Sequence, residues 1–179
     1  IESLKEKLEQ AERDEVLPKI LIPVHLSGLP CEMKEIFELS KKYGFKIIED
    51  ASHAIGSKYS IQKNSKVGNC EFSDITVFSF HPVKIITTGE GGLCCTNDID
   101  LAAKMHQLKA HGVNRNIENF DCDSNEKWNY AQESIGFNYR MTELQAALGL
   151  SQFTRLEQYI KKRNEIRTVY DEHLSNLPL

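Results

Sequence analysis

The sequence lacks the marks of several large classes of protein. Its five cysteines are odd in number and form no C-x-x-C pair, which argues against a disulfide framework or a zinc ribbon. No stretch approaches the roughly 18 to 20 apolar residues that span a bilayer, and the first ten residues lack the apolar core of a signal peptide. No dense run of lysine or arginine lies on a DNA-reading pattern. We therefore expect a cytoplasmic protein with no nucleic-acid or membrane partner, whose cysteines are small apolar residues in a reducing compartment. The cysteines are Cys31, Cys70, Cys94, Cys95 and Cys122.

The length and composition of the chain are typical of one folded domain. The chain has 179 residues, of which 40% are hydrophobic and 27% charged, and a formal charge of -4. A chain of this size can bury roughly 70% of its unfolded surface, so a folded domain is expected. No repeat, low-complexity tract or linker marks an internal boundary. The polar stretch from Asn114 to Asn129 predicts a surface excursion.

The first half of the chain alternates between helical and strand patterns. Apolar residues at helical spacing predict a helix from Glu2 to about Arg13, followed by a buried strand over 19–24. A second helix is expected over about 31–43, with Gly44 as its C-terminal stop, and a strand follows over 45–49. Strand, helix and strand in this order form a βαβ unit, whose two strands are parallel.

The second half begins with two short strands, over 75–80 and 93–96. The glycine-rich connection between them, in which glycines supply positive φ angles, favours a hairpin and therefore a mixed sheet. A helix is expected over about 99–111. Beyond it, apolar spacing predicts one continuous helix over 142–175, which at 1.5 Å per residue would be roughly 50 Å long.

Several chemically capable side chains follow the predicted strands, where open α/β sheets bind their ligands. They include Asp50, His53, Ser79 and Lys84. Each has an ordinary structural interpretation: Asp50 as a cap of the next helix, His53 as a structural residue at that helix start, Ser79 as a core hydroxyl, Lys84 as a solvated cation. Lys84, however, has apolar neighbours and no charge nearby in the sequence, an environment that lowers the pKa of an imine-forming lysine.

The set is more informative than its members. An imine-forming lysine, an acid that keeps a ring nitrogen protonated and a hydroxyl for a phosphate group are what pyridoxal 5'-phosphate (PLP) requires. The residue types at these strand ends therefore favour a PLP site.

Four segments make the chain recognisable. They read IPVHLSGLP (22–30), EDASHAIGSKY (49–59), SFHPVKIITTGEGG (79–92) and GFNYRMTELQAALGL (136–150). Together they resemble the PLP-dependent sugar aminotransferases of the DegT/DnrJ/EryC1/StrS family, and the third is most similar to the transaminases of pseudaminic acid synthesis. The resemblance implies an α/β fold: the large domain of a fold-type I PLP-dependent transferase, like that of aspartate aminotransferase, with a mostly parallel sheet flanked by helices.

The resemblance also implies roles for individual residues. Lys84 would bond covalently to the cofactor, Asp50 would pair with its ring nitrogen and His53 would lie against its ring. Ser79 would contact the phosphate group. Asn138 would reach the phosphate of the neighbouring subunit, so the family pattern implies a homodimer with shared active sites.

The implied reaction is amino transfer, with glutamate as the expected donor, to a nucleotide sugar. An example of the acceptor is a UDP-4-keto-6-deoxy-N-acetylhexosamine in surface-glycan biosynthesis. Lys84 favours transamination because related dehydratases have histidine in its place. Family members are longer than this chain. We therefore expect residues 1–179 to be a central part of the large domain, truncated at both ends and inactive alone, with 142–175 leading toward an absent small domain.

Two alternatives from other classes remain open. A metal-dependent hydrolase would use His25, Asp50, His53 and His81, although these lack a paired ligand spacing and leave the lysine unused. A catalytically silent paralogue would act as a binding module. The residues near the substrate to which the sequence assigns no role are His81, Glu90, Arg115, Trp128 and Arg140.

Overall fold

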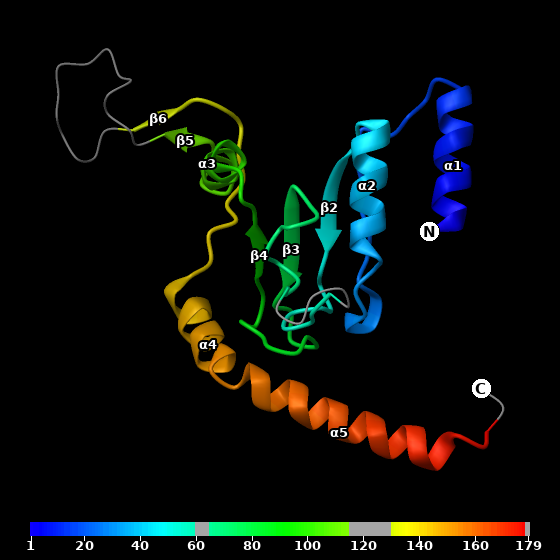
Figure 1. The fold of residues 1–179 in the computed structure, drawn as a ribbon. Helices are drawn as coiled ribbons and strands as arrows, with labels where there is room; N and C mark the ends of the chain where they lie inside the picture. Colours follow the sequence, from blue (N-terminus) through cyan, green and yellow to red (C-terminus); the bar gives the residue numbers. More distant parts are fainter. Residues whose placement is uncertain (60–64, 115–129, 178–179) are drawn as a thin grey trace. The chain divides into compact units, whose positions relative to one another are not determined.

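The computed structural model divides the chain into two compact units (Figure 1). The first comprises Ile1–Thr96 and Glu143–Leu179, and the second comprises Asn97–Thr142. Composition does not change at these boundaries, so the sequence gives no sign of them. Nearly all of the excursion predicted over 114–129 lies outside the described residues, as do Arg115, Cys122 and Trp128. The structure describes residues 1–59, 65–114 and 130–177.

A four-stranded sheet in the order β1-β2-β3-β4 forms the centre of the first unit. β1, β2 and β3 run parallel, and β4 is antiparallel to β3, which confirms the predicted mixed sheet. The predicted strand over 19–24 is reduced to two residues. Pro23 has no N–H to donate and interrupts its ladder, although Val24 still forms an isolated bridge to Asp50. The strands are β1 (Ile20–Leu21), β2 (Lys46–Asp50), β3 (Ile75–Ser79) and β4 (Gly92–Cys95).

Two amphipathic helices precede β2. α1 (Glu2–Arg13) buries Leu8, and α2 (Met33–Tyr43) forms the crossover between β1 and β2. The chain leaves α2 at Gly44, whose φ of 80° lies in the left-handed region and whose N–H donates to the Ser40 carbonyl at 2.8 Å. The predicted βαβ unit and its glycine stop are both confirmed.

The core lies between α2 and the sheet. Met33 and Ile36 of α2 pack with Phe78 of β3 and Ile47 of β2 in one buried cluster. β2 alternates between buried and half-buried positions, so that Glu49 shares the buried face with Ile47. The next residue, the half-buried Asp50, therefore points to the opposite face of the sheet.

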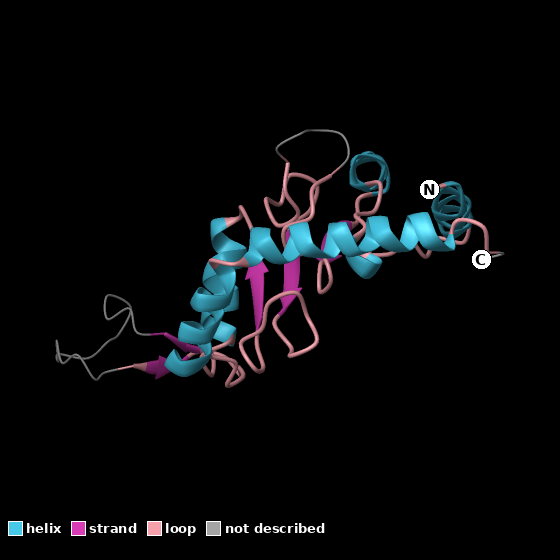
Figure 2. Cartoon of the chain, turned by 90° about the horizontal axis from the view of Figure 1, so that it is seen from below, coloured by secondary structure: helices cyan, strands magenta, loops and turns pink. Residues whose placement is uncertain are grey.

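The helix predicted over 142–175 is in fact two helices, α4 (Glu143–Phe153) and α5 (Leu156–Leu174). At the break, the Thr154 hydroxyl donates to the Ser151 carbonyl at 2.9 Å, which competes with the helical pattern. The helix restarts at the buried Leu156. Figure 2 shows α5 as the long helix that leads to the C-terminus.

The second unit contains α3 (Ile99–Leu108) and a small hairpin of β5 (Val113–Asn114) and β6 (Ala131–Gln132). α3 ends three residues before the predicted boundary. His111 and Gly112 have φ angles of 64° and 72°, which no helix can continue through. Within the described ranges, no helix is both long and apolar enough to cross a membrane.

The packing of α5 on the turn after β2 can be tested at a glycine. A Cβ at Gly56 would lie 2.3 Å from Ile160 Cδ1, whereas Gly44 has nearly the same φ and nothing within 4 Å. Gly44→Ala should therefore lower the free energy of unfolding by roughly 1 kcal/mol through backbone conformation alone. Gly56→Ala should cost roughly 1 to 3 kcal/mol more because the new methyl group is overpacked.

Ile160→Val removes the Cδ1 atom and should relieve part of that penalty in the double variant. Denaturant unfolding of the four proteins in the cycle measures the coupling. Additive effects, with Gly56→Ala no worse than Gly44→Ala, would contradict the packing of α5 on this turn.

Candidate active site

The predicted functional residues of the first unit gather at one edge of the sheet. β2 and β3 are parallel and in register, with Asp50 opposite Val77, so their carboxyl ends share that edge. Asp50 ends β2 and Ser79 ends β3, while His53 and Lys84 lie in the turns that follow. The fold therefore places four of the five predicted residues where α/β sheets bind ligands.

Asp50 is held as an anion. Its Oδ1 accepts the Ser52 N–H at 3.0 Å. Hydrogen bonding from Ser52 lowers the pKa of this carboxyl group, and the positive charge of Lys84 lowers it further against the effect of burial. No helix begins here: the chain forms turns after β2, so the predicted helix cap is wrong, and Asp50 stabilises an Asx-type turn.

His53 is exposed and lies in this turn, so the helix start predicted for it is also wrong. Its Nδ1 accepts the backbone N–H of Ser27 at 3.2 Å. A neutral imidazole that accepts at Nδ1 carries its proton on Nε2. The exposed edge of the ring therefore presents a hydrogen-bond donor.

Lys84 is half-buried in the turn after β3, and its backbone N–H donates to the His81 carbonyl at 3.0 Å. Of the apolar neighbours of Lys84 in the sequence, Ile86 is buried, whereas Val83 is 74% exposed to solvent. The sequence shows no charge near Lys84, but the fold supplies one, since Lys84 and Asp50 interact electrostatically across two strand ends.

The segment after Lys84 folds back on the end of β3. Phe80 donates its N–H to the Gly91 carbonyl at 2.8 Å, and its own carbonyl accepts the Thr88 N–H at 3.0 Å and the Thr87 hydroxyl at 2.9 Å. Gly89 has a φ of 81°, which confirms that the glycine run supplies a left-handed position. These bonds fix the loop that carries Lys84. Ser79 begins the same turn and is half-buried. Among the described residues, its hydroxyl accepts a single long hydrogen bond of 3.4 Å, from the His81 N–H.

Directly beneath the edge lies a buried carboxylate that the sequence analysis did not single out. The Glu49 side chain is 0% exposed and accepts four hydrogen bonds. Its Oε2 receives His25 Nε2 at 2.7 Å and the Tyr59 hydroxyl at 2.5 Å, and its Oε1 receives the hydroxyls of Ser73 and Thr76. Burial alone would raise its pKa, but these four bonds outweigh it and hold the pKa below its ordinary value. The sequence signal that could have identified Glu49 is its place in KIIED (46–50), where a charged residue occupies a position expected to be buried.

His25 is equally buried, and both of its ring nitrogens are engaged. Its Nδ1 accepts the Cys31 N–H at 3.2 Å, so Nε2 carries the proton that is donated to Glu49. The metal-hydrolase alternative requires His25 as a ligand, and this ring has no nitrogen left to bind a metal. In the part of the chain that the structure describes, no three His, Cys, Asp or Glu side chains are grouped to hold a metal ion.

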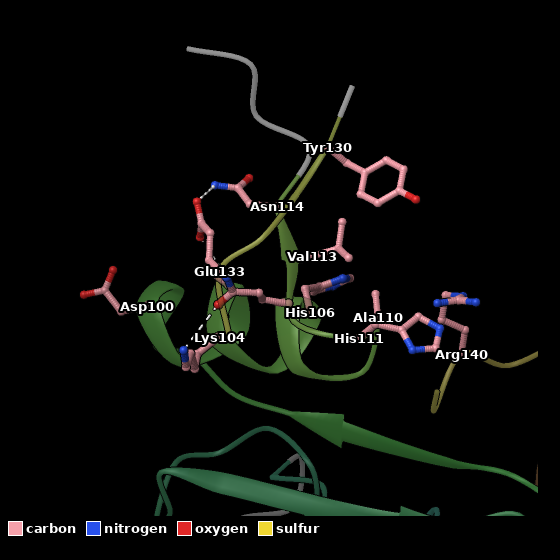
Figure 3. Close-up of a pocket in the computed structure, with 12 residues that line it drawn as sticks. Asp100, Lys104, His106, Ala110, His111, Val113, Asn114, Tyr130, Glu133 and Arg140 are labelled. Atoms are coloured by element: carbon pink, nitrogen blue, oxygen red, sulfur yellow. Dashed lines mark hydrogen bonds between the residues drawn. The ribbon is translucent and has the colours of Figure 1, made fainter. Parts of the chain in front are cut away.

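Of the residues without a predicted role, His81 and Glu90 flank the Lys84 turn, with Nε2 and Oε1 3.9 Å apart. Arg140 lies in the second unit, where it lines a cavity of about 960 Å³ together with Lys104, His106 and His111 (Figure 3).

Asn138, the remaining residue of the predicted set, also belongs to the second unit. It is exposed and forms an antiparallel bridge with Ala110.

These elements define an α/β domain of the aminotransferase type, with a mostly parallel sheet and the candidate functional side chains at its strand ends. The chain belongs to the DegT/DnrJ/EryC1/StrS aminotransferase family, whose model matches residues 2–179. This confirms the resemblance seen in the sequence.

Among curated relatives, the chain is 40% identical to a GDP-perosamine synthase of Caulobacter vibrioides over 159 residues, covering 89% of this chain and 38% of that protein. It is also 40% identical to a UDP-4-amino-4,6-dideoxy-N-acetyl-beta-L-altrosamine transaminase of Campylobacter jejuni over 149 residues, covering 83% and 36%. The chain thus spans about two fifths of the length of the relatives it matches.

Solved structures agree on the fold. Helicobacter pylori PseC, an aminotransferase in the biosynthesis of pseudaminic acid, superposes with a TM-score of 0.80 at 36% identity, covering 92% of this chain and 40% of that one. A Streptococcus pneumoniae protein solved in its PLP form gives a TM-score of 0.71 at 28% identity, covering 88% and 42%.

The buried carboxylate makes a prediction about acid stability. Because the pKa of Glu49 is lower in the folded protein than its ordinary 4.5, its stabilisation is fully present above that value. It is lost as the pH falls through the folded pKa. Glu49→Gln should cost roughly 2 kcal/mol at pH 7, and this difference from the wild type should shrink in acid.

Denaturant unfolding between pH 7 and pH 3 measures the effect. Glu38→Gln is the matched control, since Glu38 is exposed on α2 and pairs only with Lys41 among the contacts described. A difference for Glu49→Gln that is the same at both ends of the pH range would contradict a buried anion.

Proposed function

We propose that the protein transfers an amino group, with glutamate as the expected donor, to a keto-sugar nucleotide, using PLP bound at the carboxyl ends of β2 and β3. The observation that carries this proposal is the grouping of Asp50, His53 and Lys84 at one sheet edge in a chain of the aminotransferase family. Four described cysteines are free, which fits a reducing compartment such as the cytoplasm.

The residues present fit the cofactor chemically. Asp50 is ionised by its hydrogen bonds from Ser52 and the positive charge of Lys84, so it can hold a ring nitrogen protonated. His53 presents an Nε2–H toward solvent, and Ser79 offers a hydroxyl that has a single long hydrogen bond, at 3.4 Å, among the described residues. Lys84 supplies the amine for covalent attachment. The PLP form of the Streptococcus pneumoniae relative supports the same cofactor.

When bound, PLP supplies an electron sink that stabilises negative charge at the α-carbon of an amino acid. The chain's own residues then handle protons and orientation. Once the incoming amino group has displaced it, Lys84 Nζ can take the proton from that α-carbon. It would then deliver the proton to the C4' carbon of the cofactor. Asp50, held as an anion, would keep the ring nitrogen protonated and the ring therefore electron-withdrawing.

For the acceptor we propose a UDP-4-keto-6-deoxy-N-acetylhexosamine in surface-glycan biosynthesis. The Campylobacter jejuni relative and the PseC structure both support an amino-sugar substrate of this kind. The Caulobacter vibrioides relative, at the same 40% identity, is named for a GDP-linked sugar. Assays with UDP- and GDP-linked 4-keto sugars therefore separate the two nucleotides.

We further propose that the protein acts as a homodimer in which Asn138 serves the partner's cofactor site. Exposed apolar side chains support an interface. α4 leaves Leu144 85% and Leu150 71% exposed, and in the second unit Ile135 and Tyr139 are 91% and 73% exposed. Such side chains are costly to leave in water, and a second copy of the chain would cover them.

The covalent role of Lys84 predicts that Lys84→Ala abolishes amino transfer from glutamate. It should also abolish the absorption band of protein-bound PLP that borohydride removes. Lys58→Ala is the control, since Lys58 is an exposed lysine in the same unit. A borohydride-sensitive band that survives in Lys84→Ala would refute the assignment. A wild-type protein that binds PLP without amino transfer would instead favour the binding-module alternative.

The role of Asp50 predicts that Asp50→Asn loses amino transfer by roughly 100-fold or more, because a neutral amide cannot hold the ring nitrogen protonated. PLP should still bind, since Lys84 is unchanged. Steady-state rates and cofactor titration measure the two effects separately. Unchanged turnover in this variant would contradict the role.

A further inference from the structure

One short segment contacts both of the proposed ligand-binding residues at the end of β2. The Pro23 carbonyl accepts the Asp50 N–H at 2.9 Å, and the His25 N–H donates to the Asp50 carbonyl at 3.0 Å. Two residues further on, the Ser27 N–H donates to His53 Nδ1 at 3.2 Å. The segment 23–28 therefore sets both the backbone of Asp50 and the protonation pattern of the His53 ring.

The segment has little apolar packing: Pro23 is buried, but its larger apolar side chains are exposed. Val24 and Leu26 are 47% and 66% exposed, and the adjoining Leu29 is 77% exposed. The turn also contains two consecutive left-handed residues, Ser27 at φ 55° and Gly28 at φ 86°. A non-glycine residue in this region persists only where surrounding contacts impose it.

The contact that imposes it is the His25 side chain, which is 0% exposed and lies between the exposed residues Val24 and Leu26. Its Nε2 donates to Glu49 at 2.7 Å, and its Nδ1 accepts the Cys31 N–H at 3.2 Å. Farther along, the Gly28 carbonyl accepts the Ser57 hydroxyl at 2.7 Å. His25 is thus the main anchor of the segment in the core, and its partner there is the buried carboxylate.

We propose that Glu49 and His25 form a buried positioning pair. By anchoring segment 23–28, the pair holds Asp50 in place and keeps His53 as the Nε2–H tautomer that faces the ligand. Neither member touches the ligand itself. The catalytic value of the pair rests on the proposed function, because the tautomer of His53 matters for amino transfer only if the cofactor binds at this edge.

The carboxylate is matched to this task by its four donors. Tyr59, Ser73 and Thr76 donate to the carboxylate lone pairs that His25 does not occupy. Both oxygens of the ionised group therefore accept hydrogen bonds. A glutamine at position 49 could turn its NH₂ toward the Ser73 and Thr76 hydroxyls, which can also accept. Glu49→Gln is therefore a shape-preserving variant that removes the charge and weakens the hold on His25.

The test uses the protein at its full natural length. The tautomer of His53 is read from ¹⁵N resonances of labelled histidines without cofactor, assigned by their loss in His53→Gln. The wild type should show a single Nε2–H form. His25→Leu should give a mixture of tautomers and lower kcat by roughly 10- to 100-fold with a smaller change in KM, since positioning errors act on the rate.

Three further variants sharpen the result. His25→Gln keeps a donor toward Glu49 and an acceptor toward Cys31, so it should restore most of the single tautomer and of kcat. Glu49→Gln should shift both readouts in the direction of His25→Leu, by a smaller amount. His173→Leu, on the exposed end of α5, should change neither readout.

An unchanged His53 tautomer in a folded His25→Leu protein would overturn the positioning pair. If that variant does not fold, an unchanged tautomer in Glu49→Gln would do so. A tautomer change in a protein whose wild type shows no amino transfer would support the hold on His53 and contradict the proposed function. Normal amino transfer with an unchanged tautomer would contradict the pair alone.

Discussion

The structure of the first unit depends on one buried negative charge. Glu49 is fully buried and its four partners are all hydrogen-bond donors, so the charge is stabilised only when every partner is in place. An unpaired charge in such a position costs several kcal/mol. The donors come from the segment after β1, the turns after β2, the loop before β3 and β3 itself. One carboxylate therefore fixes the elements that surround the proposed active site.

Because β2 is pleated, its neighbouring residues Glu49 and Asp50 point to opposite faces of the sheet, one structural and the other proposed to bind the ligand. Glu49 points into the core with Ile47, and Asp50 points to the other face, where Ser52 and Lys84 keep it ionised. The buried side is rigid because it is saturated with hydrogen bonds. On the exposed side, the Nε2–H of His53 and the Lys84 amine have no hydrogen-bond partner among the described residues. The hydrogen bonds around the buried Glu49 thus help to preorganise the site on the exposed side.

Local patterns were sufficient for much of the fold. Gly44 as a left-handed stop, the βαβ crossover and the hairpin of β3 and β4 all follow from residues close in sequence. The position of Asp50, Ser79 and Lys84 after strands was enough to place them at one edge. Patterns failed at two places: the turn after β2, where Ser52 bonds to Asp50 in place of a helix cap, and the break before Leu156, where Thr154 bonds to Ser151. Patterns also cannot show distant contacts, such as that of Leu156 and Ile160 with the turn at Gly56.

The Glu49 cluster illustrates the same limit, since its donors lie up to 27 residues away and no spacing reveals them. The central claim is that Lys84 carries the cofactor at this edge. It is tested most directly by adding PLP to the full-length protein, reducing with borohydride, digesting, and locating the modified lysine by mass spectrometry. The account predicts the cofactor on the peptide that contains Lys84. Modification of a different lysine, such as Lys58 or Lys66, with Lys84 unmodified, would contradict it.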